Sequence, residues 1–548
     1  MLTATLALTS CSDTWDDHYK SVTNGDGSLW QAMTADGDLS NFTAVLEACG
    51  YRDALDGSQV FTVFAPVNSA FTETMRDSVI ALYNTQKQKG VKDSRNEAIK
   101  EFVKNHVALY NYSVSSLTND SVVMMNGKYL VLSSNSFGNG QLLRSNVLTS
   151  NGILYTVSEV STYLPNIYEY IGRDSDLDSL ANYIYEYSID VFSPSQSVPG
   201  EIRDGKQEYL DSVTYVQNEI MSYWLDADLT DEDSTYWFLA PTNSVWEREI
   251  PKYETYFQYD QKVKGRDSLM YNLPRVSLFM GSVFSCNVNP EKSRRDSLLS
   301  TNAVPYSRRR LYWGSYDMKY FQFDKPFDEG GALEQTTDVT CSNGVVKKAD
   351  LWNVKPTQTF MRKLIVEAES YYALDSVYTV STREPSYYAS ISTNPLYESV
   401  SNHIYAEIAP TSTSNFKALF DIRNVMSNVE YDLYLVAVPA YAGDTLARTL
   451  NTKFRATVYY HDMEGKEVNF KTTDAFTTNL YTQSDTVVTY HVDTILIGTY
   501  TFPTCSVNLD EAQVKVLLEG RVSSSDVNKG LATKTLNLDC FILKPHEE

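Results

Sequence analysis

The pattern of apolar and polar positions changes near residue 360. Downstream of this point, apolar and polar residues alternate with a period of two in several short runs, among them residues 431–438, 453–460 and 513–518. Such alternation predicts β-strands with one buried face, and the Gly, Asn, Asp and Ser residues between the runs predict turns. We therefore expect an antiparallel β-sandwich over residues 360–548.

The part of the chain before residue 360 contains a repeated block. Residues 60–71 read VFTVFAPVNSAF, and residues 236–246 read YWFLAPTNSVW. An Asp-x-Asp-Leu motif precedes each block and an Asn-Gly pair follows it. Three matches in the same order predict two copies of one structural unit, the second with insertions. The paired positions are Ala65 and Ala240, Pro66 and Pro241, Asn68 and Asn243, Asn151 and Asn343, and Gly152 and Gly344.

The repeated positions have predicted structural roles. The run ahead of Pro66 is β-branched and aromatic, which predicts a buried strand that ends at Pro66 because proline has no N–H to donate. Asn68 or Ser69, and Asn243 or Ser244, are expected to cap the helix that follows each strand. The two Asn-Gly pairs predict hairpin turns between short strands.

These motifs together resemble the fasciclin domain. The resemblance rests on the strand followed by Phe-Ala-Pro-x-Asn-Ser-Ala-Phe, on the later Asn-Gly-Ile, and on an Asn-His-x-x-x-Tyr stretch at His106. The second copy lacks this histidine. The resemblance implies a compact α+β unit of a β-wedge and helices, with roles in adhesion or ligand binding and no catalysis.

The expected fold is therefore multidomain. Two α+β fasciclin-like domains, at residues 25–165 and 166–359, are followed by an all-β, jelly-roll-like sandwich at residues 360–548. At the level of fold class, this sandwich resembles the galactose-binding or carbohydrate-binding kind.

The first 24 residues form a separate leader. A short apolar run ends in Leu-Thr-Ser-Cys11, and acidic residues follow. This resembles the lipobox of a bacterial lipoprotein signal peptide, which implies cleavage before Cys11 and lipidation of its thiol; the missing basic residues suggest a start further upstream. Acidic residues after the cysteine resemble the surface-export signal of Bacteroidetes lipoproteins. We expect a cell-surface protein on the outer membrane, attached to the membrane by lipid only.

The composition of the chain mainly excludes classes of partner and binding site. The length of 548 residues predicts about three or four domains. The chain is acidic, with a net charge of −23 and a pI near 4.7. Its negative field repels nucleic-acid phosphates and anionic lipid, so no nucleic-acid partner is expected. Apart from Cys11 the cysteines form no CxxC motif, and we expect buried free thiols. Pairing of Cys286 with Cys341, or of Cys505 with Cys540, is the alternative.

The common catalytic motifs are missing from the sequence. It contains no GxSxG, HExxH, Walker A or GxGxxG pattern, so we expect no catalytic residue, no cofactor and no metal site. Calcium binding near Asp174 would need the glycine and glutamate of an EF-hand loop, which are missing. Because Asp36 occupies the same place in the first copy, helix capping is the simpler interpretation. His106 is expected to stabilise the fold by bonding a backbone carbonyl, with ligand contact as the alternative.

An insertion in the second copy is rich in aromatic residues. Aromatic rings stack on sugar faces and concentrate at interfaces, although these rings could instead form the core of the insertion. A neighbouring basic run could hold an anionic ligand such as an acidic sugar, or it could be a solvated loop. The candidate ligand-binding residues are Tyr312, Trp313, Tyr316, Tyr320, Arg308, Arg309 and Arg310.

The expected function is non-catalytic binding or adhesion at the cell surface. Such lipoproteins resemble accessory subunits of SusC/SusD-like nutrient importers, so an outer-membrane or surface protein partner and a glycan or peptide ligand are expected. One alternative is a glycan-active hydrolase or esterase with its site in the C-terminal sandwich, because paired carboxylates follow no spacing rule in sequence. Another is a purely architectural part of an outer-membrane complex.

Overall fold

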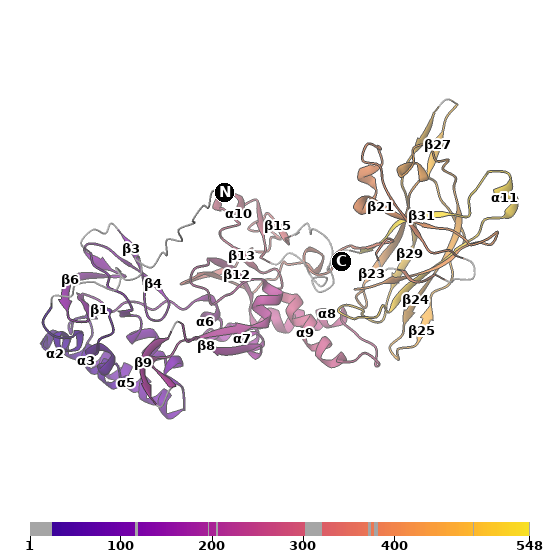
Figure 1. Ribbon diagram of the computed structural model, residues 1–548. Coiled ribbons are helices and arrows are strands. Elements are labelled where there is room, and N and C mark those ends of the chain that lie inside the picture. The colour runs from indigo at the N-terminus through magenta and orange to yellow at the C-terminus, as the bar shows by residue number, and fades with distance from the viewer. Residues whose placement is uncertain are drawn as a thin grey trace, which may run out of the picture.

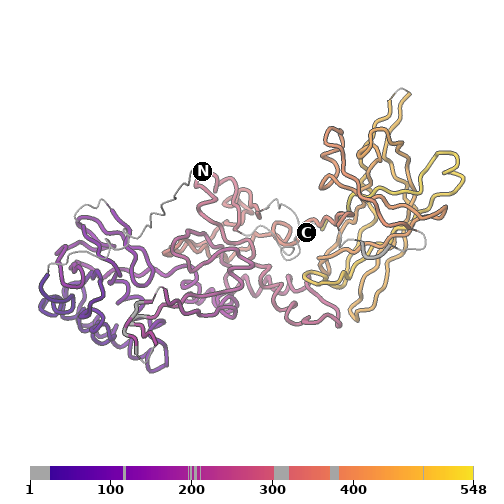
Figure 2. Tube along the Cα trace, in the orientation of Figure 1, coloured from indigo at the N-terminus to yellow at the C-terminus, as the bar shows by residue number. Residues whose placement is uncertain are grey.

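Three regions follow one another in the computed structural model (Figures 1 and 2). It describes residues 25–546 except 115–118, 196, 204–205, 302–319, 371–373, 378–381 and 486. In both views the indigo first region and the orange-to-yellow last region lie at opposite ends, with the magenta second region between them. The molecule is therefore elongated.

The first region is a seven-stranded sheet with helices packed on it. Its helices are α2 (Leu29–Thr34), η1 (Gly37–Leu39), α3 (Ser40–Ala48), α4 (Arg52–Asp56), α5 (Glu73–Gln88), η2 (Asp93–Arg95) and η3 (Ala98–Val103). Its strands are β1 (Phe61–Pro66), β2 (Val107–Ala108), β3 (Asp120–Val123), β4 (Tyr129–Leu132), β5 (Ser136–Phe137), β6 (Gly140–Thr149) and β7 (Gly152–Val157). The order is β2-β1-β7-β6-β5-β4-β3. β1 runs parallel to β7 and is buried along its whole length, as the sequence predicted.

The second region repeats the central part of this arrangement. Its helices are α6 (Ile167–Ile171), η4 (Ser175–Leu177), α7 (Asp178–Glu186), η5 (Ile220–Leu225), α8 (Asn243–Thr255), α9 (Arg266–Phe279), α10 (Glu291–Arg294) and η6 (Pro356–Gln358). The sheet order is β13-β12-β17-β16, from β12 (Tyr236–Pro241), β13 (Val283–Ser285), β16 (Thr337–Cys341) and β17 (Gly344–Ala349), and β12 is parallel to β17. Three two-stranded sheets are added, from β8 (Ser188–Phe192) with β11 (Thr214–Asn218), β9 (Val198–Arg203) with β10 (Lys206–Asp211), and β14 (Ser297–Leu299) with β15 (Gln322–Asp324).

Each copy has the same hydrogen bond at the asparagine of its Asn-Gly pair. Oδ1 of Asn151 accepts a bond from the backbone N–H of Leu29 at 2.7 Å. In the second copy, Oδ1 of Asn343 accepts the equivalent bond from Ile167 at 2.9 Å. Each asparagine also lies in the turn of a hairpin, β6–β7 or β16–β17, which confirms the predicted turns.

The predicted capping roles of Asn68 and Asn243 are wrong. Thr72 caps the helix that follows Asn68 and Ser69, and Asn243 and Ser244 are themselves the first two residues of α8, so the serine alternatives are wrong as well. Instead, Oδ1 of Asn68 accepts from the backbone N–H of Asn41 at 3.0 Å, and Oδ1 of Asn243 accepts from that of Ser179 at 2.8 Å. Each asparagine therefore caps an earlier helix, α3 or α7, because the fold brings the free N–H groups of that helix beside the end of the strand.

Two antiparallel sheets form the C-terminal β-region, from β18 to β31. The first contains β18 (Leu364–Glu367), β20 (Ser386–Ala389), β21 (Ile404–Ile408), β23 (Glu430–Ala437), β29 (Asp493–Thr501) and β31 (Leu536–Pro545). The second contains β19 (Leu374–Val377), β22 (Lys417–Ile422), β24 (Lys453–His461), β25 (Glu467–Asn469), β26 (Phe476–Thr477) and β30 (Val514–Gly520). Outside the sheets lie η7 (Tyr397–Ser399), η8 (Ser401–His403), η9 (Ala440–Ala442), α11 (Ser524–Asn528) and the hairpin of β27 (Tyr481–Gln483) with β28 (Val488–Tyr490).

The two sheets face each other across a shared core. The rings of Phe420 on β22 and Phe541 on β31 have centroids 5.2 Å apart. The predicted strand-rich, antiparallel architecture is confirmed, and the jelly-roll connectivity stays a prediction.

A buried charge joins the first region to the second. The side chain of Lys128, which is 5% exposed, follows the first-region strand β3. Its Nζ lies 3.1 Å from Oε2 of Glu169, 2.5 Å from Oε1 of Glu232 and 3.0 Å from Oγ of Ser342, all in the second region. Lys100 also pairs with Glu169. Burial alone would raise the pKa of Glu169, but these two lysines outweigh it and lower the pKa to about 2.

A continuous apolar core joins the second region to the C-terminal β-region. Phe257 and Tyr259, just after α8, are fully buried in the same cluster as the sheet residues of the β-region. The hydroxyl of Tyr259 donates to the carbonyl of Val507 at 2.8 Å, and the side chain of Gln513 donates to Asp260 at 2.7 Å. This junction is therefore packed like a domain interior.

Candidate functional site

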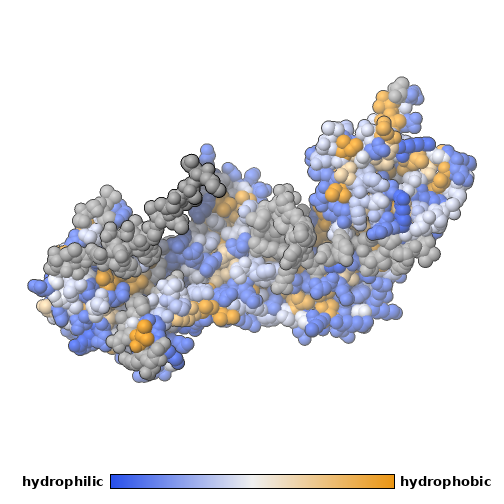
Figure 3. Space-filling model, in the orientation of Figure 1, coloured by the Kyte–Doolittle hydropathy of each residue, from blue (hydrophilic) through white to orange (hydrophobic). Residues whose placement is uncertain are grey.

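The face shown in Figure 3 is mainly hydrophilic, with scattered apolar residues. Exposed apolar residues include Val487, which precedes β28, and Val488, the first residue of β28. Two hollows next to the segment 352–362, which leads from the second region into the C-terminal β-region, combine apolar and polar groups and are the candidate ligand sites.

The larger hollow, here named the junction cleft, has a volume of about 780 Å³. Its walls come from α8, from the segment 352–361 and from loops of the C-terminal β-region. The apolar part of its lining includes Tyr253, Tyr256, Trp352, Val354, Met361 and Val429. Tyr253 is buried, with its ring centroid 5.3 Å from that of Phe360, and burial raises its pKa. The aromatic lining therefore rests on the core of the junction.

The rim of the junction cleft is charged, and its carboxylates are paired. Glu249 accepts from Nε of Arg248 at 2.7 Å and from Nζ of Lys252 at 3.0 Å. Across the cleft, Nδ1 of His546 lies 2.6 Å from Oε1 of Glu430. A hydrogen bond to Asp432 raises the pKa of His546, which favours its charged form. The rim therefore offers hydrogen-bonding groups of both signs.

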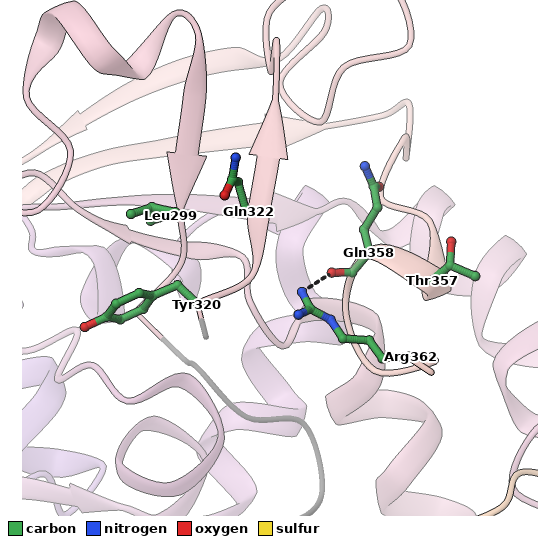
Figure 4. Close-up of a pocket in the computed structure, with 6 residues that line it drawn as sticks. All are labelled: Leu299, Tyr320, Gln322, Thr357, Gln358 and Arg362. Atoms are coloured by element: carbon green, nitrogen blue, oxygen red, sulfur yellow. Dashed lines mark hydrogen bonds between the residues drawn. The ribbon is translucent and has the colours of Figure 1, made fainter. Parts of the chain in front are cut away.

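The smaller hollow, of about 510 Å³, also borders the segment 352–362 (Figure 4). Leu299, Tyr320 and Gln322 line it on one side and Gln358 and Arg362 on the other. The guanidinium of Arg362 donates to the carbonyl of Gln358 at 2.8 Å, and burial lowers the pKa of this arginine. Thr357 lines both hollows.

The structure places only part of the predicted ligand-binding set. Tyr320 lines the smaller hollow, beside the buried Phe321. The other candidates lie outside the described residues, and so does the predicted lipidation site. These are Arg308, Arg309, Arg310, Tyr312, Trp313, Tyr316 and Cys11. Among the described residues, no helix combines the length and apolarity that would let it cross a bilayer.

The described cysteines are free thiols, as expected. Neither alternative pairing occurs between Cys286 and Cys341 or between Cys505 and Cys540. Burial raises the pKa of the Cys341 thiol to about 11 and that of Cys505 to about 12. Such thiols carry little thiolate at neutral pH, which argues against a nucleophilic role.

Three carboxylates converge in the C-terminal β-region, a cluster that the sequence analysis missed. Oxygens of Glu367 and Asp539 lie with the Cys540 sulfur within 4.8 Å of one another, and burial raises the pKa of Asp539 and of Glu369 to about 7. The backbone N–H of Ser401 donates to both oxygens of Asp539 at 3.1 Å. Clustered carboxylate oxygens are the ligand type that Ca²⁺ prefers, so these residues could hold such a cation.

The signal for this cluster was weak because its members come from distant strands. Glu367 is the last residue of β18, and Glu369 lies in the turn that follows it. Asp539 joins them only because β18 pairs with β31, with Glu367 opposite Cys540.

The comparison with protein families decides the nature of the first region. The family model of the Fasciclin domain matches residues 37–161. This part of the chain is a fasciclin domain. Its repeated motif positions, Asn68 and Asn151, hold helices α3 and α2 against the strand ends.

The histidine of the Asn-His-x-x-x-Tyr stretch has both ring nitrogens occupied. His106 is fully buried. Its Nδ1 lies 2.7 Å from the carbonyl oxygen of Phe102, and its Nε2 accepts from the backbone N–H of Ser161 at 3.0 Å. Burial lowers its pKa to about 4, so the ring is neutral at pH 7. These contacts fit the expected structural role and leave no ring nitrogen for a ligand.

The Asp-x-Asp motifs of both copies act as helix caps, as predicted. Asp36, at the edge of the fasciclin domain, accepts from the backbone N–H of Asp38 and caps η1. Asp174 does the same for η4 in the second copy, through Asp176. Lys348 also pairs with Asp174 at 2.7 Å.

Solved structures similar to this chain include an adhesion protein and a carbohydrate-binding module. A FAS1 domain pair from the insect cell adhesion molecule fasciclin I shares 12% identity, with a TM-score of 0.20, over 59% of this chain and 99% of that one. The CBM22-1 xylan-binding domain of Xyn10C from Paenibacillus barcinonensis also shares 12% identity, with a TM-score of 0.20, over 34% of this chain and 94% of that one. No curated protein matches the chain.

Proposed function

We propose that this chain is a non-catalytic binding or adhesion protein of the bacterial cell surface, anchored to the outer membrane through lipid on Cys11. The observation that carries the proposal is the fasciclin domain at residues 37–161, since such domains are generally adhesion or binding modules. Its histidine is committed to backbone contacts, and the described cysteines are buried or half-buried thiols whose pKa is raised by burial. These groups fit a structural part better than a catalytic one.

The proposed setting is an outer-membrane complex of the SusC/SusD kind that imports nutrients. The chain would then act as an accessory subunit that captures a glycan or peptide outside the cell. The acidic charge of −23 favours long-range repulsion from anionic surfaces, so attachment through acyl chains suits it better than attachment through a basic patch.

The experiment that tests this proposal starts from the lipidated protein in its native outer membrane. A pull-down with mass spectrometry should recover a stoichiometric β-barrel importer, and the purified chain should bind glycans or peptides without turning them over. Recovery of the chain without a partner would argue against the importer proposal and favour adhesion. If the purified chain hydrolyses a polysaccharide, and Asp or Glu variants lose this activity, the hydrolase alternative would replace the proposed binding function.

A further inference from the structure

The junction cleft has the size and walls of a small-ligand site. Its volume of about 780 Å³ falls within the range typical of such sites, roughly 300–1,000 Å³. Tyr256 and Trp352 line it, and both pack on the junction core while remaining half-buried. Each ring therefore has one side supported by the protein and can offer the rest to an occupant.

The two walls are fixed to each other before any ligand arrives. The backbone N–H of Ser427 donates to the carbonyl of Tyr256 at 3.0 Å, and its hydroxyl donates to that of Thr255 at 2.8 Å. The side chain of Asn428 donates to the same Thr255 carbonyl at 2.9 Å. Carbonyl groups at the C-terminal end of α8 are thus satisfied by a loop of the C-terminal β-region. A ligand would then pay little to order the cleft.

The charges on the rim indicate the class of ligand. Glu249 is paired with Lys252, and Glu430 is paired with His546, so the carboxylates have partners of opposite sign. A cationic ligand would have to compete with Lys252 and His546 for these carboxylates, whereas a neutral polar ligand can exchange hydrogen bonds with the pairs and with the exposed Lys355. Aromatic rings below and paired polar groups above match the apolar ring faces and equatorial hydroxyls of sugars.

We propose that the junction cleft binds a segment of a neutral oligosaccharide, stacked on Tyr256 and Trp352. This deepens the proposed function and rests on it, because it names the site and the ligand class of the captured molecule. The site belongs to neither neighbouring region alone. Both the second region and the C-terminal β-region are therefore needed for binding.

The test uses the full chain in titration calorimetry with xylohexaose, mannohexaose and cellohexaose as neutral probes, and with a tryptic peptide mixture. Tyr256→Ala and Trp352→Ala should each weaken binding of the preferred hexaose by about tenfold or more. The matched control is Tyr388→Ala on β20, an exposed tyrosine outside the cleft, which should change the affinity by less than about twofold. Melting curves establish that each variant is folded.

One more variant and the peptide probe distinguish failure of the proposed site from failure of the proposed function. Lys252→Ala, on the exposed rim, cannot unfold the core and should weaken the same hexaose by roughly threefold through one lost hydrogen bond. Hexaose binding that survives all cleft variants would overturn the site while leaving the proposed function intact. Binding of peptides only would overturn the ligand class, and no binding by any probe or cell surface would overturn both.

Discussion

The buried lysine between the first and second regions gives the sharpest test of how the regions are joined. Lys128 contacts Glu169, Glu232 and Ser342, and its side chain is 5% exposed. We consider Lys128→Met, which keeps the aliphatic stem and removes the charge. Breaking a buried ion pair by removing one partner typically costs about 3–5 kcal/mol.

The remaining contacts place the expected cost at the low end of this range. Glu169 keeps the charge of Lys100 and a hydrogen bond from the Tyr163 hydroxyl at 2.7 Å. Glu232 keeps one donor, the side chain of Asn166 at 3.0 Å, but loses its cation. We therefore expect a loss of about 3 kcal/mol. For regions of this size it should lower the melting temperature by roughly 6–12 °C.

Scanning calorimetry and small-angle X-ray scattering measure this effect. The first region should melt earlier than in the parent chain, and the radius of gyration should increase as the junction loosens. The control is Lys87→Met, which breaks an exposed pair with Asp93 at 2.9 Å and should leave the melting temperature nearly unchanged, because exposed ion pairs contribute little to stability. Equal melting temperatures for the two variants would refute the argument that the junction depends on a buried charge.

The pH dependence of the junction follows from the same charges. Glu169 has a pKa of about 2 in the folded chain against an ordinary value of 4.5, so the folded state favours its ionised form. Its contribution to stability is complete above about pH 4.5 and is lost as the pH falls toward 2. Scattering curves that stay unchanged across this interval would contradict the assignment.

Three other predictions follow from single side chains. Gly152→Ala should cost more than about 3 kcal/mol by urea unfolding, because φ is 153° and a Cβ would lie 1.9 Å from a carbonyl oxygen of β1; Gly37→Ala, with open space around it, should stay within about 1 kcal/mol. Burial raises the pKa of Asp539 to about 7, so the protonated form of this group favours the folded β-region at low pH. The melting temperature of the β-region should therefore fall from pH 5 to 8 and recover with millimolar calcium. The fall should be smaller in Asp539→Asn, where Glu369, whose pKa is also raised to about 7, still titrates. Asn68→Ala and Asn243→Ala should each cost about 1–2 kcal/mol through the lost helix cap, and unchanged melting of either would contradict the cap.

The sequence alone determined the local elements and the repeat. The β-branched run before Pro66 is a strand buried on both faces, and the Asn-Gly pairs lie at hairpin turns. Alternation after residue 360 indicated antiparallel strands correctly. These features depend on neighbours a few positions apart, so the chain carries their signal in its own order.

Only the tertiary structure decided which distant residues meet. Asn68 caps α3 rather than the helix that follows it, and Asp539 meets Glu367 through the pairing of β18 with β31. The junction cleft and the contacts of Lys128 likewise join segments from different regions. Periodicity specifies which face of a strand or helix is buried, but the partner on that face is set by how the elements pack, and no local pattern encodes it.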